Sequence, residues 1–195
     1  YRPEEEGIVL AYTSIYGNTK KAVMQLAEML ESKGCKVVVN DLARCDWAEA
    51  VEDAFRYSKL VLATTTYNAD IFPFMRQFID HLTERNFSNR TVAFIENGTW
   101  APVAVKIMKG MFEKSKDLTF AENTVKIMSA LNEESSAQLA ALAEELSDGN
   151  VETEEEAPKG ESRRFECSVC GYIYEGEELP EGSYVDYDAE GTALV

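Results

Sequence analysis

The sequence lacks any long apolar run. None of its hydrophobic stretches approaches the roughly 20 residues that a membrane-spanning helix needs. The N-terminus begins at Tyr1 rather than Met, and it shows neither a basic segment followed by an apolar one nor a small-residue cleavage site. We therefore expect a cytoplasmic protein with no membrane partner, and the missing Met suggests a piece of a longer chain.

Basic residues are scarce as well. Lys and Arg total 19 against 35 Asp and Glu, which gives a formal net charge of −16. Because phosphate backbones are bound through clusters of Lys and Arg, this balance disfavours nucleic acid as a partner. The acidity either keeps the surface solvated or steers a basic redox partner, and composition does not separate the two.

Histidine and cysteine are few, which limits the metal sites available. The single histidine, His81, falls on a predicted helix and receives no catalytic role. Cys35 and Cys45 are far apart, whereas Cys167 and Cys170 have C-x-x-C spacing near the C-terminus. In a cytosolic protein that spacing favours a metal or redox site over a structural disulfide.

Apolar runs alternate with helical patterns through residues 6–147. Strands are predicted at 7–12, 35–40, 60–64 and 91–95, with a fifth strand split between 118–120 and 125–128. Helices are predicted at 19–33, 46–57, 73–85, 102–114 and from 132 onward. Because most of these strands are apolar throughout, we predict an α/β doubly wound fold with a five-stranded parallel sheet covered on both faces.

The rest of the chain differs in composition. Residues 1–5 are interpreted as the end of a preceding linker, and the polar, acidic and aperiodic residues 148–164 as a second linker. The remaining residues, 165–195, are too few to build a core unaided, so this segment is expected to need a metal or a partner.

The loop after the first strand has the composition of a phosphate site. Free N–H groups at a helix N-terminus and nearby hydroxyls hold phosphate without a cation, and a glycine lets the backbone approach the anion. The loop lacks the Gly-x-Gly-x-x-Gly and Gly-Lys-Ser/Thr signatures, which disfavours a dinucleotide or nucleoside triphosphate. A simple turn with a helix cap is the alternative. The candidate residues are Thr13, Ser14, Ile15, Tyr16, Gly17, Asn18 and Thr19.

The loops after the third and fourth strands each place one aromatic residue among small polar ones. This composition suits a flat heteroaromatic ring that is stacked and hydrogen-bonded at its edge, although an aromatic residue in a loop also serves to cover a core. The candidate residues are Thr65, Thr66, Tyr67, Asn68 and Ala69 in one loop, and Asn97, Gly98, Thr99 and Trp100 in the other. In a sheet of order 2-1-3-4-5, strands 1, 3 and 4 are neighbours, so the three loops would converge.

Residues 14–19, 66–68 and 97–100 resemble the phosphate loop and the two flavin loops of flavodoxins, most closely the flavodoxin domain of flavodiiron proteins. One departure is Thr65, where that family often has Pro. The resemblance implies a flavodoxin-like fold over residues 6–147, FMN as cofactor and electron transfer as function. In flavodiiron proteins the module follows a diiron metallo-β-lactamase-like domain that reduces dioxygen or nitric oxide. The resemblance also implies redox protein partners and allows a homo-oligomeric parent.

Residues 165–174 resemble the first half of a rubredoxin, whose iron is held by four thiolates from two C-x-x-C motifs. Such a domain follows the flavodoxin in some flavodiiron proteins, so rubredoxin or its reductase is an expected electron donor. Asp186 and Ala189 stand about where the last two cysteines belong. Cys167 and Cys170 therefore form half of a site, which is expected to hold no iron unless it is completed. A frameshift or truncation after Val185 would explain the break.

Two other functions remain open at this point. The first is a stand-alone NAD(P)H-dependent FMN quinone reductase on the same fold, although no extra segment for a nicotinamide or quinone pocket is apparent. The second is a flavodoxin-like interaction module without a cofactor. The sequence does not distinguish dioxygen from nitric oxide as terminal acceptor in the parent protein.

Overall fold

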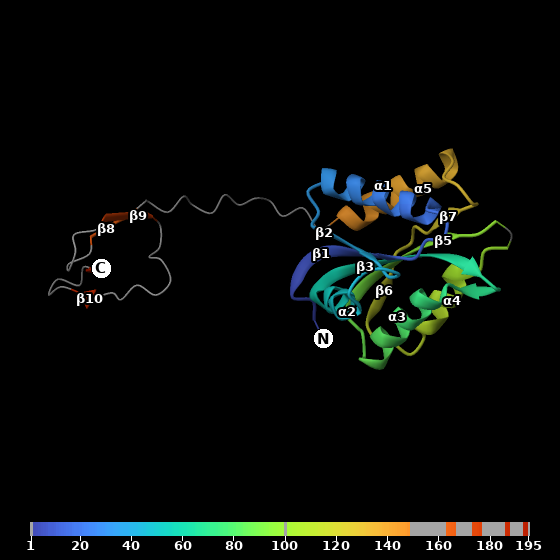
Figure 1. The fold of residues 1–195 in the computed structure, drawn as a ribbon, viewed down its shortest axis with the longest axis horizontal. Helices are drawn as coiled ribbons and strands as arrows, with labels where there is room; N and C mark the ends of the chain where they lie inside the picture. The colour runs from blue at the N-terminus through green and yellow to red at the C-terminus, as the bar shows by residue number, and fades with distance from the viewer. Residues whose placement is uncertain are drawn as a thin grey trace. The chain divides into compact units, whose positions relative to one another are not determined.

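The computed structural model describes residues 2–99 and 101–148, together with the backbone of the short strands at 163–166, 173–176, 186–187 and 193–194. The chain divides into two compact units, Tyr1–Glu152 and Thr153–Val195. The first unit contains the whole α/β fold (Figure 1).

A parallel sheet forms the centre of the first unit. The path β2-β1-β3-β5-β6 runs through its parallel strands, with β7 pairing further along β5 and β4 pairing antiparallel with β3. The strands are β1 (Glu5–Tyr12), β2 (Val37–Asp41), β3 (Tyr57–Tyr67), β4 (Asp70–Ile71), β5 (Arg90–Asn97), β6 (Leu118–Phe120) and β7 (Val125–Ile127). The helices are α1 (Asn18–Ser32), α2 (Trp47–Arg56), α3 (Pro73–Glu84), α4 (Ala104–Met111) and α5 (Glu133–Ser147).

The predicted five-stranded sheet of order 2-1-3-4-5 is corrected to a seven-stranded sheet. The short strand β4 was not predicted, so the strand expected as the fourth is β5. The expected fifth strand is two strands, β6 and β7. It breaks because the backbone N–H groups of Glu122 and Asn123 donate to the carboxylate of Glu145 on α5, at 2.7 and 2.9 Å, instead of to β5.

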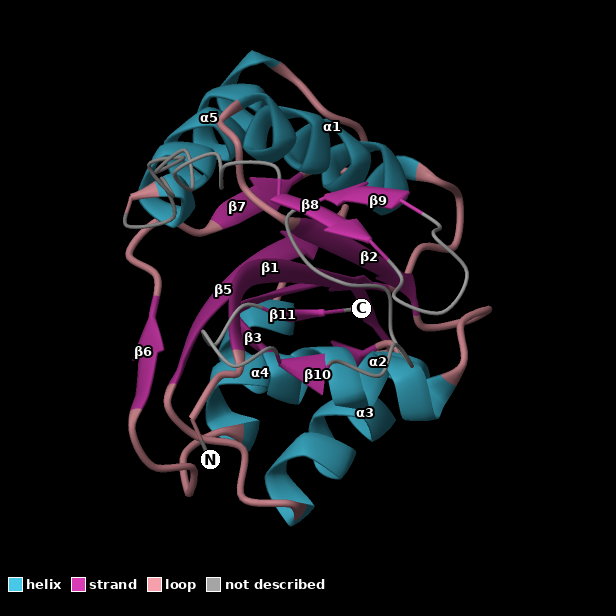
Figure 2. Cartoon of the chain, turned by 90° about the vertical axis from the view of Figure 1, so that its left-hand side faces the viewer, coloured by secondary structure: helices cyan, strands magenta, loops and turns pink. Residues whose placement is uncertain are grey.

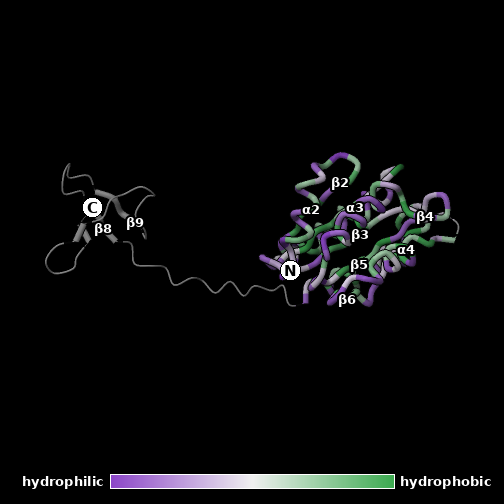
Figure 3. The backbone as a smooth tube through the Cα atoms, turned by 90° about the horizontal axis from the view of Figure 1, so that it is seen from below, coloured by the Kyte–Doolittle hydropathy of each residue, from purple (hydrophilic) through white to green (hydrophobic). Residues whose placement is uncertain are grey.

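Helices cover both faces of the sheet. Figure 2 shows α1 and α5 on one side and α2, α3 and α4 on the other. Along β1, Ile8 and Leu10 pack with the α1 and α5 side chains, whereas Val9 and Ala11 pack with those of α2 to α4. Figure 3 shows the resulting hydrophobic stretches in the interior and polar stretches in the outer loops. Burial on both faces is why the central strands are apolar throughout.

The helix starts follow from their capping residues. The Asp46 side chain accepts from the N–H of Ala48 at 2.8 Å, and Asn132 forms a capping box with Ser135. Pro73 is the first residue of α3, as expected. The helix expected at 102–114 is shorter, Ala104–Met111, because the N–H groups of Phe112 and Glu113 bond to the carbonyls three residues back, at 3.2 Å each, and so form turns.

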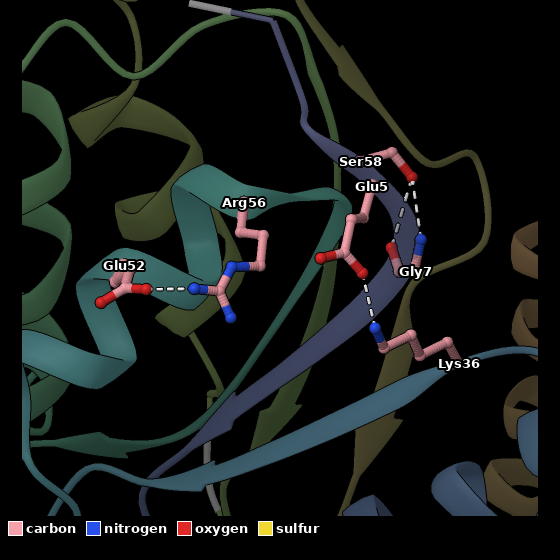
Figure 4. A network of polar contacts seen from close by, with 6 residues as sticks. All are labelled: Glu5, Gly7, Lys36, Glu52, Arg56 and Ser58. Carbon is pink, nitrogen blue, oxygen red and sulfur yellow. Dashed lines mark hydrogen bonds and ion pairs between the residues drawn. The ribbon is translucent and has the colours of Figure 1, made fainter. Parts of the chain in front are cut away.

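Charged residues gather where the strands begin. In Figure 4, Lys36 and Glu5 form an ion pair at 2.5 Å, and Arg56 pairs with Glu52 within α2. Ser58 bonds to both the N–H and the carbonyl of Gly7, at 3.4 and 3.3 Å. At this amino-terminal edge of the sheet, these side chains therefore bond to other groups of the same chain.

The second unit contains two antiparallel pairs. β8 (Arg163–Glu166) pairs with β9 (Ile173–Gly176), and β10 (Asp186–Tyr187) pairs with β11 (Ala193–Leu194). Arg163, near the end of the linker predicted at 148–164, begins β8, and Glu5, the last residue of the linker predicted at 1–5, begins β1. Cys167 and Cys170 lie outside the described residues.

No helix in the described part of the chain is long and apolar enough to cross a bilayer.

Candidate functional site

A cavity of about 300 Å³ opens at the carboxyl ends of the strands. Its walls come from the segment between β1 and α1, the end of β3, the segment after β5 and the segment after β7. The described residues that line it are Ser14, Ile15, Tyr16, Asn18, Thr19, Thr65, Thr66, Tyr67, Asn97, Gly98, Thr99 and Ser129. Four segments far apart in the sequence are thus brought together.

The start of α1 forms one side of the cavity. Gly17 precedes the helix with a φ of 88°, a left-handed conformation that glycine adopts without steric cost, and its N–H donates to Ser14 Oγ at 3.1 Å. No side chain caps the helix. The first-turn N–H groups lack intrahelical acceptors by geometry, so this end of α1 offers donors and a positive dipole to an anion.

Thr13 is a predicted site residue that does not line the cavity. It is 1% exposed, and its hydroxyl lies 2.7 Å from that of Thr64 on the neighbouring strand. This buried pair links β1 to β3 beneath the cavity, and the contact of Thr13 with a cofactor stays a prediction.

The residues expected as the second loop form a hairpin instead. β3 continues through Tyr67, and β4 pairs with it through Thr66–Ile71 and Tyr67–Asp70. Asn68 and Ala69 form the turn with φ values of 50° and 57°, and neither lines the cavity. Positive φ at both central residues matches the tight turns that join twisted antiparallel strands.

An ion pair holds the hairpin against α3. The side chain of Asp70 pairs with Arg76, and this hydrogen bond holds the pKa of Asp70 below its ordinary value. Tyr67, on the same hairpin, lines the cavity with 42% of its surface exposed. The centroid of its ring lies 5.4 Å from that of Phe72.

The segment after β5 is held by hydrogen bonds to side chains of two strands, β3 and β5. Thr66 Oγ1 accepts from the N–H of Val103 at 3.1 Å, and the buried Glu96 carboxylate accepts from the N–H of Val105 at 3.0 Å. Gly98 lies so close to Pro102 that an added Cβ would sit 3.1 Å from its Cβ. Glu96 therefore serves as the cap that Val103 does not supply. Trp100 lies outside the described residues.

Ser129 lines the cavity and was not among the residues predicted from the sequence. It follows β7, whose carboxyl end lies at the same edge as those of β1, β3 and β5. The available signal was a polar residue directly after the last strand, but the uncertain course of that strand hid it.

The cavity is uncharged, and its rim is apolar. None of the described lining residues is acidic or basic. Ile15, Tyr16 and Tyr67 are exposed by 47%, 90% and 42%. At the end of β1, burial and the charge of Asp41 raise the pKa of Tyr12 to about 12, so its phenol stays neutral and bonds to Asp41 at 3.2 Å. Neutral donors beside exposed aromatic rings suit a ligand with one anionic end and one flat apolar end.

The described residues contain no cluster of three or more His, Cys, Asp or Glu side chains that could hold a metal. Cys35 is buried and Cys45 is partly buried, and both are free thiols.

Comparison with known families decides the relationship. The model of the flavodoxin family matches residues 10–172. The chain belongs to the flavodoxin family. This flavodoxin-family chain is also similar to the anaerobic nitric oxide reductase flavorubredoxin of Escherichia coli O1:K1 / APEC, at 23% identity over 187 residues, covering 88% of the chain and 39% of the relative. It thus spans about two fifths of the curated relatives it matches.

Two solved structures share the fold. Rubredoxin oxygen:oxidoreductase from Desulfovibrio gigas aligns with a TM-score of 0.69 at 17% identity, covering 75% of this chain and 36% of that one. Oxidised flavodoxin 1 from Bacillus cereus aligns with a TM-score of 0.64 at 17% identity, covering 74% of this chain and 99% of that one. The same fold therefore occurs both as part of a larger chain and as a complete one.

Family and fold imply FMN binding. The cavity fits this group, since an uncapped helix start and hydroxyl groups lie at the same opening as the exposed ring of Tyr67.

Proposed function

We propose that the chain is the FMN-binding electron-transfer module of a flavodiiron-type oxidoreductase. It takes electrons from a rubredoxin-like or other donor, such as rubredoxin or its reductase, and passes them to a diiron metallo-β-lactamase-like domain that reduces dioxygen or nitric oxide. The observation that carries the proposal is the uncharged cavity in which the uncapped start of α1 and the Tyr67 ring meet.

The start of α1 binds the phosphate. Ser14 and Thr19 hydroxyls and the first-turn N–H groups donate to its oxygens, while the left-handed Gly17 lets the chain turn tightly into the helix. With no Lys or Arg among the described lining residues, the helix dipole and these neutral donors hold the anion.

The Tyr67 hairpin and the segment after β5 hold the ring. Tyr67 covers one face, and Trp100 is assigned to the other. Thr65, Thr66, Gly98 and Thr99 line the space between, where their polar groups meet the ring edge. Asn68 and Ala69 shape the turn that presents Tyr67. When bound, the flavin ring accepts and returns one or two electrons, and the protein orients it and excludes water.

Two observations favour a module of a larger reductase over a stand-alone flavodoxin. The matched relative is named a nitric oxide reductase flavorubredoxin, of which this chain covers 39%. The cavity rim also exposes Ile15 and Tyr16, and exposed apolar groups around a site mark a surface that meets another protein.

FMN binding is tested with a matched pair of glycine substitutions. Gly17 and Gly34 stand at the two ends of α1 with φ of 88° and 80°, and an added Cβ meets nothing within 4 Å at either. Gly17→Ala and Gly34→Ala thus introduce similar backbone strain, but only Gly17 stands between two residues that line the cavity, Tyr16 and Asn18. Titration of FMN by fluorescence quenching should give tight 1:1 binding in the wild type, a loss of about tenfold or more in Gly17→Ala, and wild-type affinity in Gly34→Ala.

A wild-type chain that leaves FMN fluorescence unchanged would contradict the proposal. Electron transfer is then tested by mixing the reduced holoprotein with a separately purified diiron domain and following flavin absorbance. Rapid steady-state NADH oxidation with a quinone, in the absence of that domain, would instead identify a quinone reductase.

We further propose that Cys167 and Cys170 form half of a rubredoxin-type site without iron. Iron analysis of the purified chain should give no stoichiometric iron, and one iron per chain with a rubredoxin-like spectrum would overturn this assignment.

A further inference from the structure

The side chain of Asn97 holds the segment after β7 at the cavity. Asn97 Nδ2 donates to the carbonyl of Ser129 at 3.0 Å, and Oδ1 accepts from the N–H of the same residue at 3.1 Å. Nδ2 also donates to Thr19 Oγ1 at 3.4 Å, in the first turn of α1. One amide, 8% exposed, therefore joins the end of β5 to two other walls of the cavity.

Ser129 is held in a conformation that its residue type disfavours. Its φ is 72°, in the left-handed region where a residue with a Cβ bears a steric cost. Such outliers persist when the surroundings enforce them, and here two hydrogen bonds with Asn97 do so, together with the bond across Ser129 from the Ala130 N–H to the Met128 carbonyl at 3.1 Å. Ser129 is also exposed, and it lines the cavity together with Ser14 and Thr19. The strained residue thus lies at the site.

We propose that Ser129 forms a fourth wall of the cofactor site and that its hydroxyl donates to the phosphate of FMN, with Asn97 as the positioning residue. This inference rests on the proposed function. The phosphate end is favoured because Asn97 links Ser129 to Thr19, in the helix turn to which the phosphate is assigned. No described lining residue carries a positive charge, so the affinity for the phosphate depends on each neutral donor.

The hydroxyl is tested by Ser129→Ala with two ligands, FMN and riboflavin, which lacks the phosphate. We expect the dissociation constant for FMN to rise about tenfold and that for riboflavin to stay unchanged. Ser32→Ala, at the far end of α1, is the matched control and should leave both unchanged. Wild-type FMN affinity in Ser129→Ala, or equal losses for the two ligands, would overturn the assignment to the phosphate.

The positioning role is tested by thermal unfolding of the cofactor-free chain, which does not depend on FMN. Asn97→Ala should lower the midpoint by several degrees in the wild-type background. In a Ser129→Gly background, Asn97→Ala should lower the midpoint less, because glycine adopts a positive φ without support from Asn97. Equal losses in both backgrounds would contradict the role of Asn97.

A second substitution guards against a chain that fails to fold. Asn97→Asp keeps the acceptor for the Ser129 N–H and loses the donors, so its midpoint should fall between those of wild type and Asn97→Ala. A midpoint at or above the wild-type value would count against the positioning role of Asn97. If instead wild-type protein fails to bind FMN while the Asn97–Ser129 coupling is measured as expected, the proposed function fails and the positioning role of Asn97 stands.

Discussion

The two edges of the sheet are built in opposite ways. At the amino-terminal edge, charged side chains bond to one another and to the backbone, as with the Lys36–Glu5 pair and with Lys59 Nζ, which donates to the Leu146 carbonyl at 2.6 Å. At the carboxyl-terminal edge, the described lining residues are uncharged, and large apolar side chains stand exposed around them.

This difference separates stability from binding. The charged side chains named at the amino-terminal edge bond to other groups of the same chain. Polar groups at the other edge, such as the first-turn N–H groups of α1, remain directed at a cavity. We therefore expect substitutions at the first edge to change the free energy of unfolding, and substitutions at the second to change FMN affinity.

The largest effect is expected at the amino-terminal edge, for Arg90→Ala. Arg90 is 3% exposed, and its guanidinium donates to the carbonyls of Ser88 at 2.9 Å, Asn89 at 3.2 Å and Phe55. Removing it takes a charged donor away from three partly buried carbonyls, which should cost about 3 kcal/mol of unfolding free energy in urea denaturation. FMN affinity under native conditions should stay unchanged, and a loss of affinity would break the separation of the two edges.

The next effect is expected at the cavity, for Gly98→Ala. The new Cβ would lie 3.1 Å from Pro102 Cβ, 3.3 Å from Pro102 Cα and 3.4 Å from Thr66 Oγ1, so the segment after β5 must shift. FMN affinity should fall about tenfold by fluorescence titration. Gly110→Ala, where an added Cβ meets nothing within 4 Å, is the control and should leave affinity unchanged. Equal affinities in the two variants would contradict a rigid cavity wall.

A smaller effect concerns the pH dependence of stability and Tyr12, the last residue of β1. Burial, with the neighbouring Asp41, raises the pKa of Tyr12 to about 12, above the value of about 10 for an unfolded tyrosine. The resulting stability is complete below about pH 10 and is lost as pH rises through about 12. Over this range the unfolding free energy of Tyr12→Phe should fall less than that of the wild type, by about 1 kcal/mol. Parallel pH profiles would show that the phenol is not held neutral.

The smallest effect is expected for Ala69→Gly in the hairpin turn. Ala69 has a φ of 57°, which glycine adopts without steric cost, although glycine also loses more entropy on folding. The substitution should raise the unfolding free energy by about 0.5 kcal/mol, measured by urea denaturation. A destabilised variant would indicate that the Ala69 methyl group makes contacts that outweigh its strain.

Much of the fold was predictable because its signals are local. The Asp46 and Asn132 caps and Pro73 mark helix starts wherever they occur, and continuous apolar runs mark strands buried on both faces. Most of the cavity was predictable as well, since residues that follow parallel strands share one edge. The errors lie where distant residues compete for the backbone: Glu145 breaks the last strand, and β4 turns an expected loop into a hairpin.

The sequence by itself determined the alternating elements, the acidic charge and the hydroxyl and aromatic residues placed after successive strands. Only the tertiary structure decided that Thr13 lies buried against Thr64, that Tyr67 sits on a hairpin held by Arg76, and that Asn97 draws Ser129 to the cavity. The physical reason is the separation along the sequence between the interacting residues. Capping and periodicity act within a few residues, whereas these contacts join positions that are adjacent only after the strands have paired.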